Sequence, residues 1–377
     1  MELTDASLTL FFTRGMTLKT WEEIGLIDRE LAIYRKLSNS LKTLNIVTYG
    51  GDEDKEYIDK LDGLRIFPAI WFDKQRNTIR YLLEKYRPDL QNSAILKTNQ
   101  IPGSEIPLWF KEKFGNKLIV RCGYLYTRNT IKGEKGRRAI KKAIQLEKKA
   151  FMQADLGIVT SEWQRDIIID HYNLRPEKVK VVPNYVVTDV FKPSSEIQKE
   201  YDLVYVGRGG TEKNLENLIK AINYLKSKKR HLSLVLIGRC CFDDKIKQIT
   251  KKYQLNVLYK GNVPNFDLPN ILNQAKVFIL PSYYEGHPKT LLEAMSCALP
   301  CIGTNVTGIK EDIEHLVTGY LCETDYMSIA KAIESLLTDE FLRIKLSRNA
   351  RDYVVKNYSI DRIFQLELKA IQELLNS

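Results

Sequence analysis

Two glutamates lie on either side of a strand-to-helix junction and could bind hydroxyl groups. Glu285 follows an apolar strand expected at 277–280, and Glu293 lies in the second turn of an expected helix, with Pro288 at its first position and 289–296 after it. The start of a helix offers free N–H groups and a positive dipole end, which suit a phosphate. Hydroxyls, phosphate and hydroxyls are the outline of a nucleotide sugar. The spacing by itself favours an ordinary strand, loop and helix with two surface glutamates.

A second strand end could supply the positive charge that such an anion needs. The expected strand that ends at Val206 runs into Gly207-Arg208-Gly209-Gly210, and Lys213 precedes the next helix. The glycines allow close approach of a ligand, and the two cations could hold a diphosphate and stabilise it as a leaving group. The next strand ends at Gly238, where a ligand could again approach the backbone. By itself, each turn is better explained as a connection with solvated basic residues.

Strands and helices alternate along the chain, which predicts parallel sheets joined by right-handed crossovers. One alternating series ends near Val182, and a polar stretch to Glu200 precedes a second series. We therefore expect two α/β units in tandem. Ligands of such folds bind at the carboxyl ends of the strands, so the expected site lies in the cleft between the units. Residues 18–41 are expected to form one helix, and residues 342–375 are expected to be almost wholly helical.

The composition is that of a globular protein with two cores. The chain has 377 residues, 44% of them hydrophobic and 28% charged, and it contains no apolar run of the ~20 residues that span a membrane. The N-terminal sequence shows no secretory signal. Six cysteines form no C-x-x-C pair, and four histidines form no zinc pattern. We expect a cytoplasmic protein with reduced cysteines and no bound metal.

Several motifs together resemble one enzyme family over roughly residues 180–360. They read V-G-R-G-G-T-E-K-N at 206–214, L-V-L-I-G at 234–238, K-G-N-V at 260–263, T-G-Y-L at 318–321, and V-F-I-L-P-S-Y-Y-E-G-H-P-K-T-L-L-E-A-M-S-C-A-L-P-C-I-G-T at 277–304. This pattern is similar to the family-4 retaining glycosyltransferases. The resemblance implies the GT-B fold, an α/β fold of two tandem Rossmann-like doubly wound domains that face each other across a cleft.

The resemblance also implies a division of labour between the two domains. Residues 1–188 would bind the acceptor, and residues 189–356 would bind the nucleotide sugar. The C-terminal helix, at about 357–377, would pack back on the first domain. A nucleotide-diphosphate sugar would serve as co-substrate, without a cofactor or a metal ion.

The family's site residues map onto matching positions of this chain. Arg208, Lys213 and Glu285 would be catalytic, with the two cations on the diphosphate and Glu285 on the transferred sugar. Glu293 would bind the ribose. The remaining donor-binding positions would be Gly207, Gly238 and Val263, with Gly286, His287, Pro288, Lys289 and Thr290 binding sugar and phosphate through their backbone groups. His287 could contact the sugar with its side chain or offer only its backbone N–H.

The first domain departs from the family pattern. Many members place a histidine near the donor sugar, but here the only histidine before residue 200 is His171, inside an expected helix. We take Arg121 and Tyr124 as acceptor-side candidates in its place. Gly15, in the turn after the first strand, is a third candidate, although a plain strand-to-helix turn explains it equally well. Asp52-Glu53-Asp54 matches the D-x-D of metal-dependent glycosyltransferases, but a solvated acidic loop is favoured.

The basic excess of the chain is concentrated in one region. Residues 101–150 contain 13 Lys and Arg against 4 Asp and Glu, and the whole chain has a net charge of +11. The expected helix at 137–152 carries basic pairs beside an apolar stripe. Such a face could meet anionic lipid headgroups or an anionic acceptor, although a packed helix with a solvated outer face is favoured. No nucleic-acid recognition motif accompanies the charge.

The sequence thus favours a retaining glycosyltransferase. Its acceptor would be a lipid-linked or glycan intermediate of bacterial surface polysaccharide, such as O-antigen, capsule or exopolysaccharide. It would act in the cytoplasm or on the inner face of the cytoplasmic membrane. A nucleotide-dependent oxidoreductase is the first alternative, but neither first-strand turn contains its G-x-G-x-x-G. A non-catalytic sugar-nucleotide-binding protein is the second, and the intact Arg208, Lys213, Glu285 and Glu293 argue against it.

Overall fold

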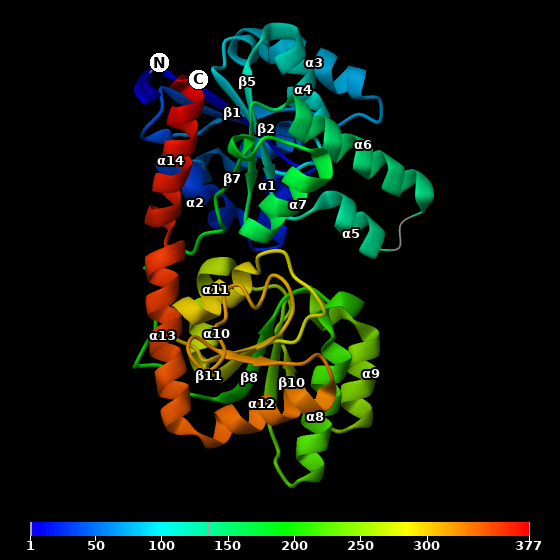
Figure 1. Cartoon of the computed structure of the whole chain (residues 1–377), viewed down its shortest axis with the longest axis vertical. Coiled ribbons are helices and arrows are strands. Elements are labelled where there is room, and N and C mark those ends of the chain that lie inside the picture. Colours follow the sequence, from blue (N-terminus) through cyan, green and yellow to red (C-terminus); the bar gives the residue numbers. More distant parts are fainter. Residues whose placement is uncertain (1, 134–135, 377) are drawn as a thin grey trace. The chain divides into compact units, whose positions relative to one another are not determined.

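The computed structural model describes residues 2–133 and 136–376, which divide into two units (Figure 1). Unit 1 comprises residues 1–184 and 363–377, and unit 2 comprises residues 185–362. The first unit ends at residue 184, four residues before the expected boundary at residue 188. The reason is that Val186 forms hydrogen bonds with residues near the end of unit 2. Its N–H donates to the Tyr358 carbonyl at 2.8 Å, and its carbonyl accepts the Ile360 N–H at 2.9 Å.

Unit 1 is built on a seven-stranded sheet in the order β3-β2-β1-β4-β5-β6-β7, and every neighbouring pair is parallel. The chain order reverses between β1 and β4, which is where open α/β sheets bind ligands. The strands are β1 (Ser7–Phe11), β2 (Thr43–Thr48), β3 (Arg65–Pro68), β4 (Ile95–Thr98), β5 (Lys117–Cys122), β6 (Leu156–Val159) and β7 (Val179–Val181).

Helices connect these strands and cover the sheet. They are α1 (Leu18–Glu23), α2 (Ile27–Ser38), α3 (Gln75–Gln91), α4 (Glu105–Phe114), α5 (Tyr126–Lys132), α6 (Arg137–Gln153) and α7 (Glu162–Tyr172). The prediction of one helix over 18–41 is wrong, because Gly25 takes a left-handed φ of 71° and separates α1 from α2.

The expected acidic loop after β2 is a short 3-10 helix over Gly51–Lys60, and Asp54 within it is fully buried. One carboxylate oxygen of Asp54 accepts the N–H groups of Leu18 at 2.9 Å and Lys19 at 3.4 Å, and the other accepts the Gly50 N–H at 3.0 Å. The side chain therefore satisfies free N–H groups at the start of α1. The prediction of a solvated loop is wrong for this residue.

Unit 2 is a six-stranded sheet in the order β10-β9-β8-β11-β12-β13, again parallel throughout. Its chain order reverses between β8 and β11. The strands are β8 (Tyr201–Val206), β9 (Ser233–Ile237), β10 (Asn256–Tyr259), β11 (Ala275–Leu280), β12 (Cys301–Thr304) and β13 (Tyr320–Cys322).

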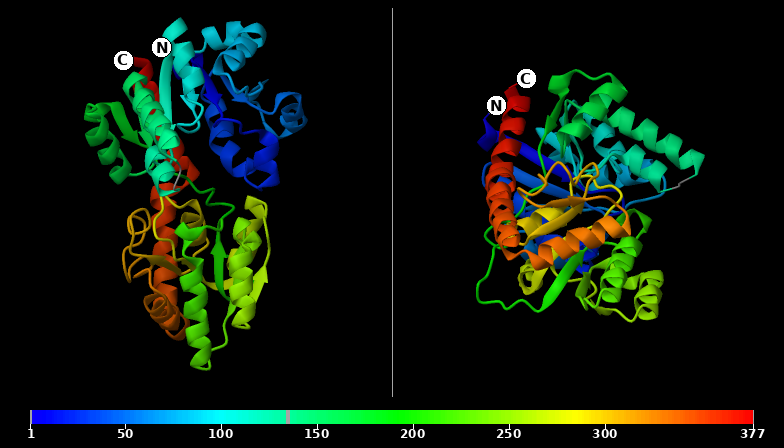
Figure 2. Two further views of the ribbon diagram at one scale, coloured as in Figure 1. Left: turned by 90° about the vertical axis from the view of Figure 1, so that its right-hand side faces the viewer. Right: turned by 60° about the horizontal axis from the view of Figure 1, so that its bottom comes forward.

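The helices of unit 2 pack on this sheet and on one another, as α12 (orange) does beside α8 (green) in Figure 2. They are α8 (Leu215–Ser227), α9 (Asp244–Lys252), α10 (Leu268–Gln274), α11 (Lys289–Ser296), α12 (Tyr326–Thr338) and α13 (Glu340–Tyr358). None of the helices in the described part of the chain combines the length and the apolar content that crossing a membrane requires.

The helical end of the chain is divided at Ser359 into α13 and α14 (Ile360–Asn376). From Ile363 onward, α14 belongs to unit 1, where its apolar face is buried. Glu367 on that face forms an ion pair with Lys97 of β4, and the exposed fractions of the two side chains are 4% and 1%. The Lys97 ammonium also lies 5.1 Å from the centre of the Tyr34 ring. A buried ion pair thus joins segments that are 270 residues apart.

We expect the replacement Glu367→Ala to destabilise unit 1 by about 3–5 kcal/mol, because it leaves the Lys97 charge buried without its partner. The matched control is Glu373→Ala on the same helix. Glu373 forms an ion pair with Lys180, and its side chain is 48% exposed. That change should cost at most about 1 kcal/mol. Urea unfolding of both variants measures the difference in the free energy of unfolding. Equal losses of stability would show that the buried pair contributes no more than the exposed one.

Candidate active site

The loops after β8 and β11 lie together at the carboxyl edge of unit 2, where the strand order reverses. Hydrogen bonds to main-chain carbonyls tie these loops to each other. The Tyr283 N–H donates to the Glu212 carbonyl at 2.9 Å, and the Asn214 side-chain amide donates to the Pro281 carbonyl at 2.9 Å. Asn214 is buried and has a left-handed φ of 54°. This role of Asn214 was not predicted from the sequence.

Lys213 and Glu285, which were proposed as separate site residues, form one ion pair. The Lys213 Nζ lies 2.7 Å from Glu285 Oε1, and each side chain is 12% exposed. Ser282 donates its hydroxyl to the same oxygen at 2.7 Å. Because both charged groups are largely removed from water, their attraction is screened less than that of a surface pair. A cation and a carboxylate are thus fixed side by side at the edge of the sheet.

Arg208 supplies a second positive charge but is held loosely. Its side chain is 72% exposed, and its guanidinium lies 3.9 Å from a carboxylate oxygen of Glu212. An exposed pair at that distance is weak, so Arg208 can turn toward an anion at little cost. Among residues 2–133 and 136–376, no three His, Cys, Asp or Glu side chains are grouped as metal ligands are.

The glycines after β8 and β9 allow backbone segments to approach one another closely. A Cβ on Gly207 would lie 2.7 Å from the Tyr205 hydroxyl, and one on Gly238 would lie 2.6 Å from the Gly207 carbonyl oxygen. Tyr205 is fully buried beneath this turn and donates its hydroxyl to the Arg208 carbonyl at 2.9 Å. Burial, with the nearby Cys240 and Glu285, raises the pKa of Tyr205 well above its ordinary value, so it remains a donor.

The loop after β10 completes this row of strand ends. The Gly238 N–H donates to the Gly261 carbonyl at 2.5 Å, and the Cys240 N–H donates to the Gly207 carbonyl at 3.2 Å. Val263, expected to border a base, is half-buried two residues beyond Gly261. The structure therefore brings Gly207, Gly238 and the segment that carries Val263 together along one edge.

The backbone at the start of α11 is supported from a distant loop. The helix begins at Lys289, and Pro288 is the residue before it and not its first residue. The Glu285 N–H donates to the Thr307 carbonyl at 3.3 Å. Gly308 has a left-handed φ of 89°, and a Cβ there would lie 2.5 Å from the Glu285 carbonyl oxygen. The backbone around 285–286 is thus held against Gly308.

The side chain of His287 points into unit 2. It is 3% exposed, and its Nε2 lies 3.4 Å from a carboxylate oxygen of the fully buried Asp312 side chain. Its ring meets the ring of Tyr358 edge-on, with 5.2 Å between centroids. Burial and the neighbouring Asp312 raise the pKa of Tyr358, which therefore remains protonated. The side chain of His287 is therefore held in the interior, and which of its groups would contact a ligand stays a prediction.

Glu293 lies in the interior at the second turn of α11. The residue is 2% exposed, and one of its carboxylate oxygens accepts a hydrogen bond from the Asn265 side-chain amide at 2.9 Å. Burial raises the pKa of Cys297, one turn later, to about 12, with Glu293 adding to the effect. The role of Glu293 in binding a ribose stays a prediction. Asn265 was not singled out from the sequence, because nothing near it in the chain points to Glu293.

The three candidates in unit 1 lie at or just after the ends of β1 and β5, with β4 between those strands. Gly15 lies in an exposed turn with φ 67° and open space around it. Arg121 is half-buried at the end of β5 and donates to the side-chain oxygen of Asn184 at 3.0 Å. Tyr124 is half-buried two residues after β5. All three thus lie at the carboxyl edge, and their role toward an acceptor stays a prediction.

Residues 187–353, which are most of unit 2, match the family described as glycosyl transferases group 1. The N-acetyl-alpha-D-glucosaminyl L-malate synthase of Bacillus anthracis is 29% identical over 51% of this chain and 53% of its own length. The UDP-Gal:alpha-D-GlcNAc-diphosphoundecaprenol alpha-1,3-galactosyltransferase of Escherichia coli is 28% identical over 52% of this chain and 54% of its own length. This chain therefore spans about half the length of the curated relatives it matches.

The sucrose-phosphate synthase of Thermosynechococcus elongatus superposes on 98% of this chain and 99% of its own, with a TM-score of 0.81 and 18% identity. That likeness and the two parallel sheets confirm the expected two-domain, Rossmann-like GT-B fold. The second unit is thus similar in sequence to the glycosyl transferases group 1 family over residues 187–353.

We expect Gly238→Ala to destabilise unit 2 by about 1–3 kcal/mol, because φ 97° and ψ −160° are accessible essentially only to glycine. Gly209→Ala is the control, since its nearest obstacle is the movable Asp243 side chain at 3.2 Å. Thermal unfolding compares the two variants. Equal stabilities would mean that the contact between the Gly238 and Gly207 backbones does not constrain the site.

Proposed function

We propose that this chain, whose second unit is similar in sequence to the glycosyl transferases group 1 family, transfers a sugar from a nucleotide-diphosphate sugar to an acceptor hydroxyl. The observation that carries the proposal is the Lys213–Glu285 pair at 2.7 Å, at the switch point of the unit 2 sheet. A diphosphate needs a cation, and the attached sugar offers hydroxyl groups to a carboxylate. The pair supplies both side by side, next to the backbone that leads into α11.

The charges of the site give each residue a role. An incoming diphosphate would share Lys213 with Glu285 and draw in the exposed Arg208, with backbone groups of 286–290 beside it. Glu285 would then accept hydrogen bonds from the transferred sugar. As the nucleotide departs, negative charge grows on the diphosphate, and fixed cations stabilise that charge most when they are already in place. In this proposal Arg208 and Lys213 take the part that a metal ion plays elsewhere, without a cofactor.

We further propose that transfer retains the configuration at the anomeric carbon. The acceptor oxygen forms its bond to that carbon on the face from which the phosphate oxygen departs. The bond between the anomeric carbon and the phosphate breaks, and the departing phosphate oxygen takes the proton of the acceptor hydroxyl. No protein base is then required. This proposal rests on the family-4 resemblance of the sequence.

The proposed acceptor is a lipid-linked or glycan intermediate of bacterial surface polysaccharide. The name of the Escherichia coli relative supports this class, since its acceptor sugar is attached to diphosphoundecaprenol and its donor is UDP-galactose. Gly15, Arg121 and Tyr124 would contribute to the acceptor side from the carboxyl edge of unit 1.

We expect the variant Glu285→Gln to lose transfer while it keeps nucleotide binding, because the carboxylate acts on the sugar and the cations on the diphosphate. The rate should fall about 100- to 1,000-fold, as when a group that stabilises a transition state is removed. Thermal-shift screening with UDP-, GDP- and ADP-sugars identifies the donor, and sugar transfer and donor hydrolysis are then measured with it.

Glu216→Gln is the control, since Glu216 pairs with Lys245 on the surface of unit 2, and this variant should keep wild-type rates. Wild-type transfer by Glu285→Gln would refute the proposed role of Glu285. A protein that binds the nucleotide sugar but neither transfers nor hydrolyses it would be the non-catalytic binding protein of the second alternative.

We also propose that the basic region 101–150 binds the anionic surface of a membrane, which would place the enzyme at its lipid-linked acceptor. Glu134 and Lys135 of this region lie outside the described residues. Helix α6 packs through buried Ala143, Ala150 and Phe151, as a helix with a core-facing stripe does, and its Lys and Arg side chains are exposed. Such side chains are attracted to anionic lipid by about 1 kcal/mol each.

We expect Lys141→Gln with Lys142→Gln to weaken sedimentation with phosphatidylglycerol vesicles about 30-fold, as two charges at about 1 kcal/mol each imply. Raised salt should weaken the binding of the unchanged protein. Lys251→Gln with Lys252→Gln, on the exposed end of α9, is the matched control. If the unchanged protein does not bind these vesicles at low salt, membrane docking through this region is refuted.

A further inference from the structure

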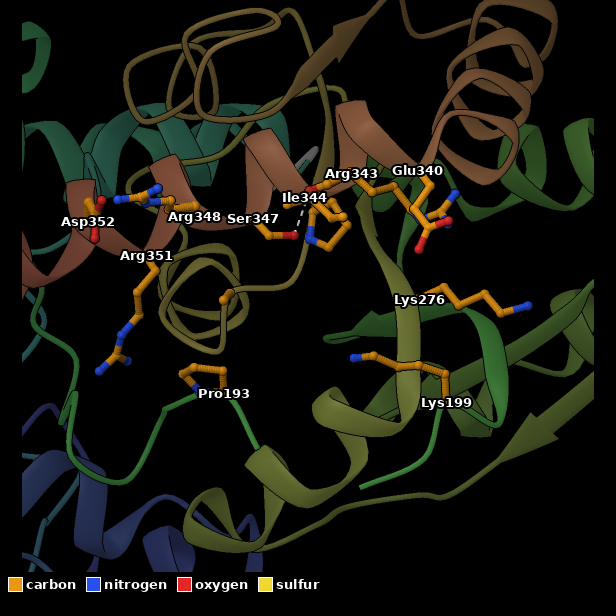
Figure 3. Close-up of a pocket in the computed structure, with 12 residues that line it drawn as sticks. Pro193, Lys199, Lys276, Glu340, Arg343, Ile344, Ser347, Arg348, Arg351 and Asp352 are labelled. Carbon is orange, nitrogen blue, oxygen red and sulfur yellow. Dashed lines mark hydrogen bonds between the residues drawn. The ribbon is translucent and has the colours of Figure 1, made fainter. Parts of the chain in front are cut away.

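A cavity of about 600 Å³ opens at the amino edge of the unit 2 sheet (Figure 3). Three of its wall residues lie at the beginnings of strands: Lys199 just before β8, Lys276 at the second residue of β11, and Pro300 just before β12. The loops that contain Arg208 and Glu285 follow the opposite ends of β8 and β11. Since a six-residue strand is about 20 Å long, the cavity is separate from the candidate active site.

One face of α13 forms the other wall. Figure 3 shows Pro193 and Lys199 across the cavity from the row of α13 side chains. That row consists of Glu340, Arg343, Ile344, Ser347, Arg348, Arg351 and Asp352. The two acidic residues stand at its ends, twelve residues and about 18 Å apart along the helix. Positive charge therefore occupies the middle of the row.

The lining as a whole is cationic, with five Lys or Arg against two acidic residues. Two of the cations already have fixed partners. The Lys276 Nζ lies 2.9 Å from a carboxylate oxygen of Asp202, and Arg343 donates to the carbonyls of Leu336 and Leu337. Lys276 is thus paired with a carboxylate. Arg343, Lys199 and Arg351 donate to neutral carbonyl oxygens, and Arg348 is exposed on the wall.

Arg351 is half-buried, and Lys199 is an exposed residue whose ammonium end lies in a partly buried hydrogen bond; both groups donate to neutral oxygen atoms. The Lys199 ammonium donates to the Asn273 carbonyl at 2.8 Å. The Arg351 guanidinium donates to the Phe191 and Ser296 carbonyls at 2.6 and 2.5 Å. Burial lowers the pKa of both groups. A cation that is partly removed from water and bonded to neutral acceptors gains when an anion arrives.

We propose that this cavity binds a phosphate-bearing ligand through Lys199 and Arg348. Arg348 is exposed on the α13 wall, and its planar group can bind two oxygens of one phosphate. Arg351 anchors the wall from below through its carbonyl contacts. The volume falls within the range of small-molecule sites, so the cavity can hold more than the phosphate itself. This site is independent of the glycosyl-transfer site proposed above.

The phosphate could belong to a soluble molecule or to a lipid headgroup. Two large apolar side chains stand exposed on the same helix: Phe341 is 88% exposed and Ile344, in the cavity wall, is 61% exposed. Apolar side chains beside cations are typical of surfaces that meet an anionic bilayer. The two sources share the same chemistry at Lys199 and Arg348, and an experiment with two arms separates them.

The first arm titrates the full chain with inorganic phosphate by calorimetry. We expect saturable binding that weakens at least tenfold in the variant Lys199→Gln with Arg348→Gln. Lys345→Gln is the matched control, because Lys345 is an exposed cation of the same helix outside the cavity wall. It should bind phosphate within twofold of the unchanged chain. Thermal unfolding confirms that each variant is folded.

The second arm measures sedimentation of the same proteins with phosphatidylglycerol vesicles. A tenfold loss in the double variant, with no loss in Lys345→Gln, assigns the site to a lipid headgroup. Unchanged vesicle binding with lost phosphate binding assigns it to a soluble phosphate compound. The proposal is overturned if the unchanged chain does not bind phosphate, or if the double variant and the control bind it equally well. Neither arm uses sugar transfer, so these outcomes do not depend on the proposed function.

Discussion

The ion pair between Lys213 and Glu285 is the interaction on which the candidate site depends. Its partners are 72 residues apart and meet because β8 and β11 are parallel neighbours whose carboxyl ends share one edge. With each side chain 12% exposed, the pair fixes the two loops before any ligand arrives. A site whose charges are already in place spends little free energy on reorganisation when an anion binds, which is the general advantage of preorganised electrostatics.

The surroundings of this pair are made largely by backbone packing. Gly207, Gly238 and Gly308 each stand where a Cβ would collide with a hydroxyl or a carbonyl at 2.7 Å or less. Beneath them, Tyr205 and His287 direct their side chains into the interior and support the turns from below. Side chains of the motif thus serve two purposes, since some hold the backbone in place and others remain available to a ligand.

Parallel topology also explains why unit 2 can carry two separate sites. All its strands run in one direction, so the loops at one edge gather Arg208, Lys213 and Glu285, and the opposite edge gathers Lys199 and Lys276 against α13. In unit 1 the same topology buries β4, whose Lys97 then needs the carboxylate of Glu367 to avoid an unpaired charge in the core. Each of these features follows from which residues begin or end a buried parallel strand.

The sequence by itself determined what depends on local order. Alternating strands and helices predicted the two α/β units. The motif predicted α11, although the helix begins one residue after the expected Pro288, and it predicted the residues that meet at the carboxyl edge. Tertiary structure alone decided that Asp54 caps α1, that His287 turns toward Asp312, that Glu293 is buried beside Asn265, and that Lys97 pairs with Glu367. The physical reason is the same in each case: the partner lies 25 to 270 residues away, and the burial that makes the contact strong exists only after the chain has folded.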